Sequence, residues 1–128
     1  KDNNLNILGR IISTAVHGCP PELMGLGPIE ASKKALKRAN LTIKDIDIIE
    51  LNEAFASQSL ACIQDLSIEP SIVNIDGGAI ALGHPLGATG ARITAKAAQL
   101  PKREKKKFAL VTQCIGLGQG ISTVLENY

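Results

Sequence analysis

Five short segments rich in β-branched residues recur along the chain, and helical patterns separate the first four of them. The expected strands are residues 11–16, 46–51, 71–75, 108–112 and 121–125. Strands that alternate with helices run parallel, because the crossover through a helix returns the chain to the same edge of the sheet. A glycine-rich turn joins the last two strands and predicts a hairpin. The order predicts a three-layer α/β domain with a mixed, mostly parallel five-stranded sheet and helices on both faces.

The three expected helices are placed by their ends and by apolar side chains at helical spacing. The first begins at Pro28, has Glu30 in its first turn and ends at Asn40, as proline geometry and the helix dipole favour. The third is expected to stop at Pro101. The inner faces of the other two are marked by Ala56, Leu60 and Ile63 in the second, and by Leu86, Ile93, Ala97 and Leu100 in the third.

Composition places the chain among domains that can build their own core. Of its 128 residues, 45% are hydrophobic and 20% charged, and a domain of this size buries roughly two-thirds of the surface of its unfolded chain. Residues 1–128 are therefore interpreted as one domain. Apolar runs fall far short of the roughly 18 residues that span a bilayer, and no signal segment opens the chain, so we expect no membrane contact.

The cysteines indicate reduced thiols. Cys19, Cys62 and Cys114 are odd in number and widely spaced, which fits neither a disulfide framework nor a zinc site with paired CxxC ligands. His17 lies two residues from Cys19, but two ligands do not make a metal site. We therefore expect no metal, and a protein of the cytoplasm or of an organelle matrix.

Charge is nearly balanced, with 14 basic and 12 acidic residues, except in segment 102–107, which carries five basic residues and one acidic residue. No aromatic side chains interleave with this segment, so we expect no nucleic-acid partner. The preferred interpretation is a solvated loop between a helix and a strand. The alternative is contact with an anionic ligand or a neighbouring subunit.

Polar residues with catalytic potential stand where expected strands end. Eight of the 12 glycines fall within residues 77–90 and 116–120, and they place His84 at an expected helix start and Cys114 at a strand end. The helix dipole favours the neutral imidazole, which can act as a base, and a thiol at a sheet edge can act as acid, base or nucleophile. Asn52 can cap a helix or hold a water molecule. The structural alternatives are a helix cap, a hydrogen-bonded turn histidine and a small buried side chain.

Two glycine-rich segments match nucleotide-binding loops in part. Residues 78–83 have the spacing of a phosphate loop, but His84 and Pro85 replace the lysine and the hydroxyl residue that bind phosphate and magnesium. Residues 116–120 resemble a dinucleotide fingerprint, but a strand follows in place of the helix whose N-terminus would bind the pyrophosphate. We therefore expect no nucleotide at either segment.

Four segments resemble signatures of the thiolase family in their order and spacing. They are Asn52-Glu53-Ala54-Phe55, residues 77–92, Cys114-Ile115-Gly116 and Met24-Gly25-Leu26-Gly27-Pro28. The resemblance implies a fold of two similar α/β halves that sit back to back, of which residues 1–128 are the C-terminal one. In this family the N-terminal half carries the nucleophilic cysteine and most of the coenzyme A binding loop. The 128 residues alone are therefore expected to be inactive.

The resemblance also implies an activity and site roles. Thiolases cleave 3-ketoacyl-CoA with coenzyme A, or condense two acetyl-CoA molecules, without a further cofactor, and a homodimer or homotetramer is expected. His84 would deprotonate the thiol of the other half and, with a water held by Asn52, stabilise the enolate oxygen. Cys114 would move the α-proton, and the Gly116 N–H would contribute to the second oxyanion hole. Three residues would line the thioester pocket: Met24, Ala54 and Phe55.

Leu117 departs from the family pattern, because members commonly have glycine there, and a tighter or shifted turn after Gly116 is expected. Two other functions stay open. A condensing enzyme of the ketoacyl-synthase type generally has a histidine or an asparagine in place of Cys114, which argues against it here. A binding module without catalysis would lack an upstream half that carries the nucleophile.

Overall fold

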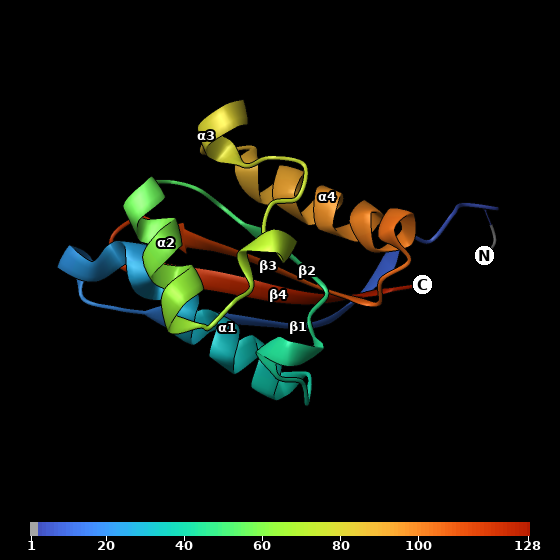
Figure 1. Cartoon of the computed structure of the whole chain (residues 1–128), viewed down its shortest axis with the longest axis horizontal. Coiled ribbons are helices and arrows are strands. Elements are labelled where there is room, and N and C mark those ends of the chain that lie inside the picture. The colour runs from blue at the N-terminus through green and yellow to red at the C-terminus, as the bar shows by residue number, and fades with distance from the viewer. Residues whose placement is uncertain (1–2) are drawn as a thin grey trace.

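Four strands form one mixed sheet within residues 3–128, the part of the chain that the computed structural model describes. They are β1 (Gly9–Gly18), β2 (Ile48–Leu51), β3 (Phe108–Ile115) and β4 (Gln119–Asn127), in the spatial order β1-β4-β3-β2. β2 is parallel to β3, whereas β4 is antiparallel to both of its neighbours. The carboxyl ends of β2 and β3 therefore meet at one edge of the sheet (Figure 1).

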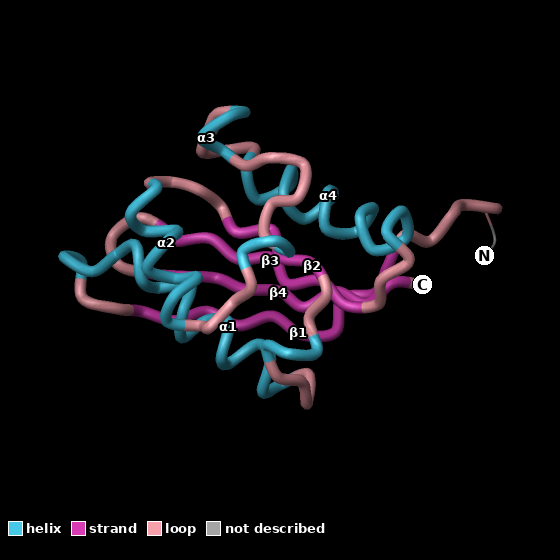
Figure 2. The backbone as a smooth tube through the Cα atoms, viewed as in Figure 1, coloured by secondary structure: helices cyan, strands magenta, loops and turns pink. Residues whose placement is uncertain are grey.

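Three longer helices form the outer layers. α1 (Gly27–Arg38) and α2 (Ala56–Asp65) cover one face of the sheet, and α4 (Thr89–Glu104) covers the other (Figures 1 and 2). The shorter elements are η1 (Pro21–Leu26), η2 (Ile43–Asp45), η3 (Pro70–Ile72) and α3 (Ala79–Leu82). The expected three layers and the terminal hairpin β3–β4 are confirmed. Among the helices of residues 3–128, none has the length and apolar character needed to cross a membrane.

Buried side chains divide into two clusters, one on each face of the sheet. The cluster under α1 and α2 includes Ala35, Leu36, Ile49, Cys62, Leu66, Leu110 and Val124. The cluster under α4 includes Ile48, Ile93, Ala97, Leu100, Ala109, Val111 and Leu125. Neighbouring residues of one strand, such as Ile48 and Ile49, belong to opposite clusters, as the two-residue period of a strand requires. Both faces of the sheet are thus apolar.

The ends of α1 follow the sequence prediction. Pro28 and Glu30 lie in its first turn, and Lys37 and Arg38 in its last. Asn40 follows the helix with a φ of 54°, a left-handed conformation that asparagine tolerates better than most residues. The helix therefore ends just before the predicted residue.

The strand expected at residues 71–75 is wrong, so within the described residues the sheet has four strands rather than five. η3 occupies the start of this segment, and Val73 makes only an isolated bridge to Ile49. Asn74 then occupies the edge of β2. Its N–H donates to the Ile49 carbonyl (2.8 Å), its Oδ1 accepts from the Leu51 N–H (3.0 Å) and its Nδ2 donates to the Leu51 carbonyl (2.8 Å). A side-chain amide thus replaces the expected strand.

The expected inner face of α2 is also wrong. Its buried residues are Gln58, Ser59 and Cys62. Ala56 and Leu60 are exposed, Leu60 to 65%, and Ile63 packs partly against the core. The rotation of the helix is set by Gly25, because Gln58 packs closely on it and the Cys62 thiol lies 3.5 Å from its carbonyl.

The third helix begins later and ends later than its apolar stripe predicts. α4 begins at Thr89, while Leu86 lies in the preceding turn and is exposed. Pro101 lies inside the helix, which continues to Glu104. The basic segment 102–107 is exposed throughout, as expected of a solvated segment, although its first three residues are helical rather than part of a loop.

The backbones of α1 and β4 touch directly at a pair of glycines. A Cβ on Gly120 would overlap the carbonyl group of Gly27, and a Cβ on Gly27 would overlap the backbone of Gln119 and Gly120. Only glycine permits such an approach of two backbones. The pair fixes the start of α1 against the turn end of the β3–β4 hairpin.

We predict that Gly120→Ala lowers the free energy of unfolding by about 3 kcal/mol or more, because backbone atoms cannot move aside as a flexible side chain can. Urea denaturation followed by circular dichroism measures this change. Gly87→Ala is the matched control, since a Cβ there meets no atom within 4 Å, and it should stay within about 0.5 kcal/mol of the parent. Equal stabilities of the two variants would contradict the role of the glycine pair.

Candidate active site

One cavity of about 480 Å³ lies where the sequence analysis expects the site. Its walls come from η1, the β2–α2 junction, the segment before α4 and the end of β3. The lining residues are Met24, Ala54, Phe55, His84, Leu86, Gln113, Cys114, Ile115 and Gly116. Six of the seven predicted site residues therefore share this cavity. The seventh, Asn52, contacts His84 from behind.

Parallel pairing of β2 with β3 brings Asn52 and Cys114 to the same sheet edge. Leu51 pairs with Thr112 in the register, and the Asn52 N–H donates to the Thr112 carbonyl at 2.9 Å. The Asn52 side chain is only 1% exposed, and its Nδ2 lies 3.4 Å from His84 Nε2. Asn52 is thus held by backbone pairing beneath the imidazole.

The hydrogen bonds of Thr89 determine which nitrogen of His84 carries the proton. The Thr89 hydroxyl donates to the Pro85 carbonyl (3.0 Å), and its oxygen lies 2.8 Å from His84 Nδ1. Because the only hydroxyl hydrogen is already used, Oγ1 accepts a hydrogen bond from Nδ1–H. In the neutral ring Nε2 then carries the lone pair and accepts from Asn52 Nδ2. The arrangement suits Nε2 for accepting a proton.

The predicted position of His84 at a helix start is wrong by one turn or more. α4 begins at Thr89, and residues 85–88 form a turn in which the Ala88 and Thr89 N–H groups both donate to the Pro85 carbonyl. The Thr89 hydroxyl, rather than the helix dipole, therefore determines which tautomer the His84 imidazole adopts. Thr89 was missed because its hydroxyl lies five residues from the histidine, and only the folded turn brings the two together.

Burial raises the pKa of the half-buried Cys114 thiol above its ordinary value. The group is therefore protonated near neutral pH and can donate a proton before it accepts one. Burial also raises the pKa of Cys62, which faces away into the core. All three cysteines are free thiols, and residues 3–128 contain no cluster of three His, Cys, Asp or Glu side chains that could hold a metal ion.

The hairpin turn after Gly116 contains Leu117 in the left-handed region, with φ of 68°, followed by Gly118 with φ of 87°. The Leu117 side chain is 88% exposed. Gly118 has no room for a Cβ, because it packs against the Cys19 carbonyl. The Gly118 carbonyl also accepts a 2.7 Å hydrogen bond from the Cys19 N–H. Residue 117 thus has the left-handed backbone conformation that glycine favours, although the residue is leucine.

Glu53 supports the site although sequence reasoning gave it no role. Its carboxylate accepts hydrogen bonds from Asn74 Nδ2 (2.8 Å) and from the Ile80 N–H (2.9 Å). It also packs against Gly78 so closely that a Cβ there would overlap the carboxylate. The Gly77-Gly78 pair before α3 is the sequence signal that could have indicated this close approach. Glu53 ties α3, and so the segment that carries His84, to the end of β2.

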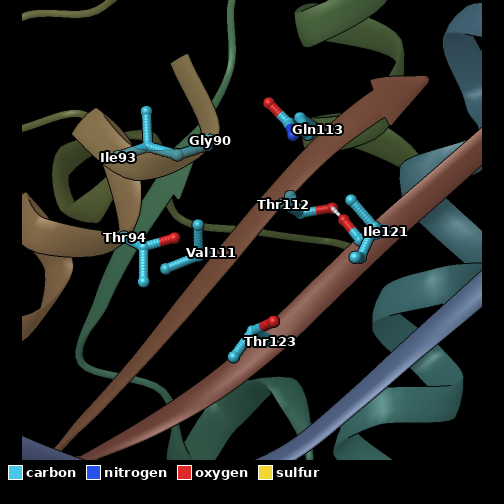
Figure 3. A pocket seen from close by; sticks show the side chains of 8 residues that line it. All are labelled: Gly90, Ile93, Thr94, Val111, Thr112, Gln113, Ile121 and Thr123. Carbon is cyan, nitrogen blue, oxygen red and sulfur yellow. Dashed lines mark hydrogen bonds between the residues drawn. The ribbon is translucent and has the colours of Figure 1, made fainter. Parts of the chain in front are cut away.

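A second cavity of about 160 Å³ lies between α4 and strands β3 and β4 (Figure 3). Its lining residues are Gly90, Ile93, Thr94, Val111, Thr112, Gln113, Ile121 and Thr123. Hydroxyl and amide groups occur among them, but no ionisable side chain does. This cavity therefore lacks the groups needed for acid–base chemistry.

Comparison with known proteins identifies the family to which this fold belongs. The family model "Thiolase, C-terminal domain" matches residues 5–127. The chain therefore belongs to the thiolase family, as a C-terminal domain.

Several proteins similar to this chain are named 3-ketoacyl-CoA thiolase. The 3-ketoacyl-CoA thiolase of Serratia proteamaculans is 57% identical over 126 residues, which cover 96% of this chain and 33% of that protein. That of Vibrio parahaemolyticus is 54% identical, with 96% and 32% covered. The crystal structure of human mitochondrial 3-ketoacyl-CoA thiolase superposes with a TM-score of 0.96 at 46% identity, over 99% of this chain and 32% of that one. A second structure of the human enzyme, in complex with CoA, matches equally. The chain thus spans about a third of these relatives.

We predict that His84 is the Nδ1–H tautomer and that Thr89→Val shifts it toward a mixture of tautomers, because the acceptor for Nδ1–H is removed. Two-bond proton–nitrogen NMR spectra of the imidazole distinguish the tautomers. Thr94→Val, on the same helix but at the second cavity, is the matched control and should leave the His84 spectrum unchanged. A wild-type ring protonated at Nε2 would refute the assignment.

We further predict that Leu117→Gly raises the free energy of unfolding by about 0.5 to 1 kcal/mol. Relief of a left-handed leucine gains about 1 to 2 kcal/mol, and the greater freedom of glycine in the unfolded chain offsets part of it. Gly118→Ala is the opposing control and should destabilise, because its Cβ would meet the Cys19 carbonyl. Thermal or urea unfolding of both variants checks the signs.

Proposed function

We propose that this chain is the C-terminal catalytic domain of a 3-ketoacyl-CoA thiolase, an acyltransferase that cleaves 3-ketoacyl-CoA with coenzyme A or condenses two acetyl-CoA molecules in the reverse direction. The observation that carries the proposal is that His84 and Cys114 line one cavity, with Asn52 in contact with His84. The name of the relatives, 3-ketoacyl-CoA thiolase, supports 3-ketoacyl-CoA as the acyl substrate. The human structure in complex with CoA supports coenzyme A as the thiol substrate.

In the cleavage direction, His84 Nε2 takes the proton of the nucleophilic thiol in the N-terminal half, and the thiolate attacks the 3-keto carbon. The bond between C2 and C3 then breaks, and the enolate of acetyl-CoA leaves. His84 and a water held by Asn52 stabilise the enolate oxygen, and the Cys114 thiol donates the proton that C2 needs. Coenzyme A finally gives its thiol proton to the Cys114 thiolate and attacks the acyl-enzyme thioester, whose oxyanion the Gly116 N–H stabilises. The cysteine of the N-terminal half leaves as a thiolate and takes back the proton held by His84.

The partners follow from the same proposal. Met24, Ala54 and Phe55 line the acyl-CoA pocket, and an N-terminal half of the same polypeptide supplies the nucleophile. Met24, Phe55 and Leu86 are exposed at the cavity, which is consistent with cover by that half. We infer a homodimer or homotetramer, with coenzyme A thioesters as substrates and no added cofactor. The free thiols support a reducing, cytoplasmic setting.

The alternatives are less well supported. A ketoacyl-synthase type of enzyme would have histidine or asparagine where Cys114 stands, and the family match is to thiolases. A binding module without catalysis would not require a lone pair on His84 Nε2 beside a protonated thiol. Neither alternative explains all three residues together.

The test is thiolysis of acetoacetyl-CoA by this chain joined to its natural N-terminal half. His84→Ala and Cys114→Ala should each lower kcat by at least about 100-fold, the usual worth of a positioned acid or base. His17→Ala is the matched control, because that imidazole lies on β1 and pairs with Lys34 at 2.9 Å, and its kcat should equal that of the parent. Wild-type rates in either site variant, or turnover by the 128 residues alone, would refute the assigned roles.

A further inference from the structure

A small cavity of about 60 Å³, separate from the 480 Å³ cavity, has Asn52 in its lining. Glu50, Asn52, Arg92 and Lys96 are among its lining residues. Glu50 lies in β2, and Asn52 directly follows the strand and continues its pairing with β3. The two are two residues apart, so their side chains project from the same face of the sheet, toward α4. α4 contributes the two basic side chains. The cavity thus places a carboxylate and two cations next to an amide of the proposed active site.

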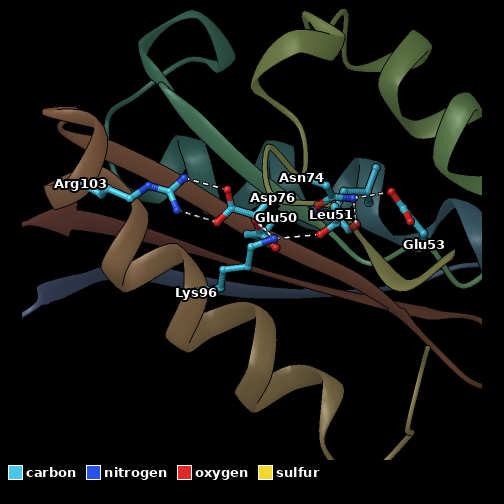
Figure 4. A network of polar contacts seen from close by, with 8 residues as sticks. Glu50, Leu51, Glu53, Asn74, Asp76, Lys96 and Arg103 are labelled. Atoms are coloured by element: carbon cyan, nitrogen blue, oxygen red, sulfur yellow. Dashed lines mark hydrogen bonds and ion pairs between the residues drawn. The ribbon is translucent and has the colours of Figure 1, made fainter. Parts of the chain in front are cut away.

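Glu50 is an acid held in the protein interior. Its side chain is 2% exposed, and burial raises the pKa of its carboxyl group against the opposing effect of Lys96. The Lys96 ammonium lies 3.2 Å from Glu50 Oε1 (Figure 4). It also donates a hydrogen bond to the Gly77 carbonyl at 2.8 Å. The sequence analysis placed Glu50 within a strand and assigned it no role. A buried carboxylate in this position requires further polar contacts.

Three buried side-chain atoms of the cavity residues have no hydrogen-bond partner among residues 3–128. They are Glu50 Oε1, Asn52 Oδ1 and Arg92 Nε. A buried polar atom without a hydrogen bond destabilises the fold unless a partner such as an ordered water is present. Two of the three atoms are acceptors and one is a donor. A single water molecule can satisfy all three, because it can donate two hydrogen bonds and accept one. The cavity volume is enough for one or two waters, at about 30 Å³ each.

We propose that this cavity is a structural water site through which Glu50 orients the Asn52 side chain, so that Glu50 is a positioning residue for the Asn52–His84 pair. The water accepts from Arg92 Nε–H and donates one hydrogen to Glu50 Oε1 and the other to Asn52 Oδ1. With Oδ1 held in this way, Nδ2 faces His84 Nε2. The role in catalysis rests on the proposed function, whereas the water site itself does not.

The charge of Glu50 is what selects this amide orientation. A carboxylate can only accept, so the water must turn one hydrogen toward it and has one left for Asn52 Oδ1. The neutral amide of Glu50→Gln can instead donate to the water, which can then accept its second hydrogen bond from Asn52 Nδ2 in place of Arg92 Nε. The Asn52 amide then turns over and presents Oδ1 to His84 Nε2, where two lone pairs oppose each other.

The first experiment is a crystal structure of the complete enzyme at a resolution that shows ordered waters. We expect a water within hydrogen-bond distance of Glu50 Oε1 and Asn52 Oδ1 in the parent, and a turned or disordered Asn52 amide in Glu50→Gln. A dry cavity, or protein groups bonded to both oxygens, overturns the proposal. This result does not depend on activity, and the parent structure decides the water site even if the variant fails to fold.

The second experiment measures thiolysis kinetics in the complete enzyme. Glu50→Gln should lower kcat about tenfold and leave KM within about twofold, because a misdirected amide affects the reacting geometry rather than substrate binding. Glu50→Asp, which keeps the charge, should recover part of the loss. Ser32→Ala is the control for lost buried polarity, since its hydroxyl bonds Ser122 at 2.9 Å on the other face of the sheet, and its kcat should match the parent.

The outcomes separate the two proposals. Parental kcat in Glu50→Gln, in an enzyme that performs thiolysis, overturns the positioning role while the proposed function stands. An enzyme that lacks thiolysis altogether refutes the proposed function, and the crystallographic result then decides the water site.

Discussion

The contact between the Gly27 and Gly120 backbones determines how the rest of the site is arranged. It seats the start of α1 directly on β4, so η1 and its Met24 lie beside the hairpin end that carries Cys114 and Gly116. Any side chain at either glycine would separate these segments by the width of a methyl group. The wall of the cavity that η1 forms is thus positioned by the lack of side chains at Gly27 and Gly120 rather than by contacts between side chains.

The opposite wall is fixed by hydrogen bonds. Asn74 bonds the edge of β2, and Glu53 connects that edge to the start of α3, whose chain leads on to His84. Bonds to a charged carboxylate are stronger than neutral ones, so this wall resists displacement when the cavity fills. The two walls meet where β2 and β3 end, and the imidazole, the amide and the thiol come from three separate parts of the chain.

The sequence predicted the positions of the candidate residues in the fold better than it predicted the secondary structure. Parallel strands bring their carboxyl ends together whatever their exact length, so the convergence of Asn52 and Cys114 followed from strand order alone. Residues 71–75 failed as a strand because the Asn74 side chain imitates a strand partner, which no pattern of β-branched residues reveals. The prediction that Leu60 lies on the buried face of α2 was wrong, because an apolar residue at helical spacing does not show which element packs against it. Thr89, Glu53 and Glu50 depend on contacts that only the fold creates.

The position of β4 has a consequence for the order of folding. β1, the first strand of the sheet, pairs only with β4 within the described residues, and β4 is the last element in the chain. During synthesis β1 can pack against α1, but its strand partner in this sheet is missing until nearly the whole domain has left the ribosome. Pairing β1 with β4 closes a long loop, and the entropy of that closure is lost before the stabilising contacts form, which makes folding slow. The backbone N–H and C=O groups of β1 stay unpaired in that interval and can pair with other chains, so the nascent domain is most prone to aggregation just before its final strand emerges.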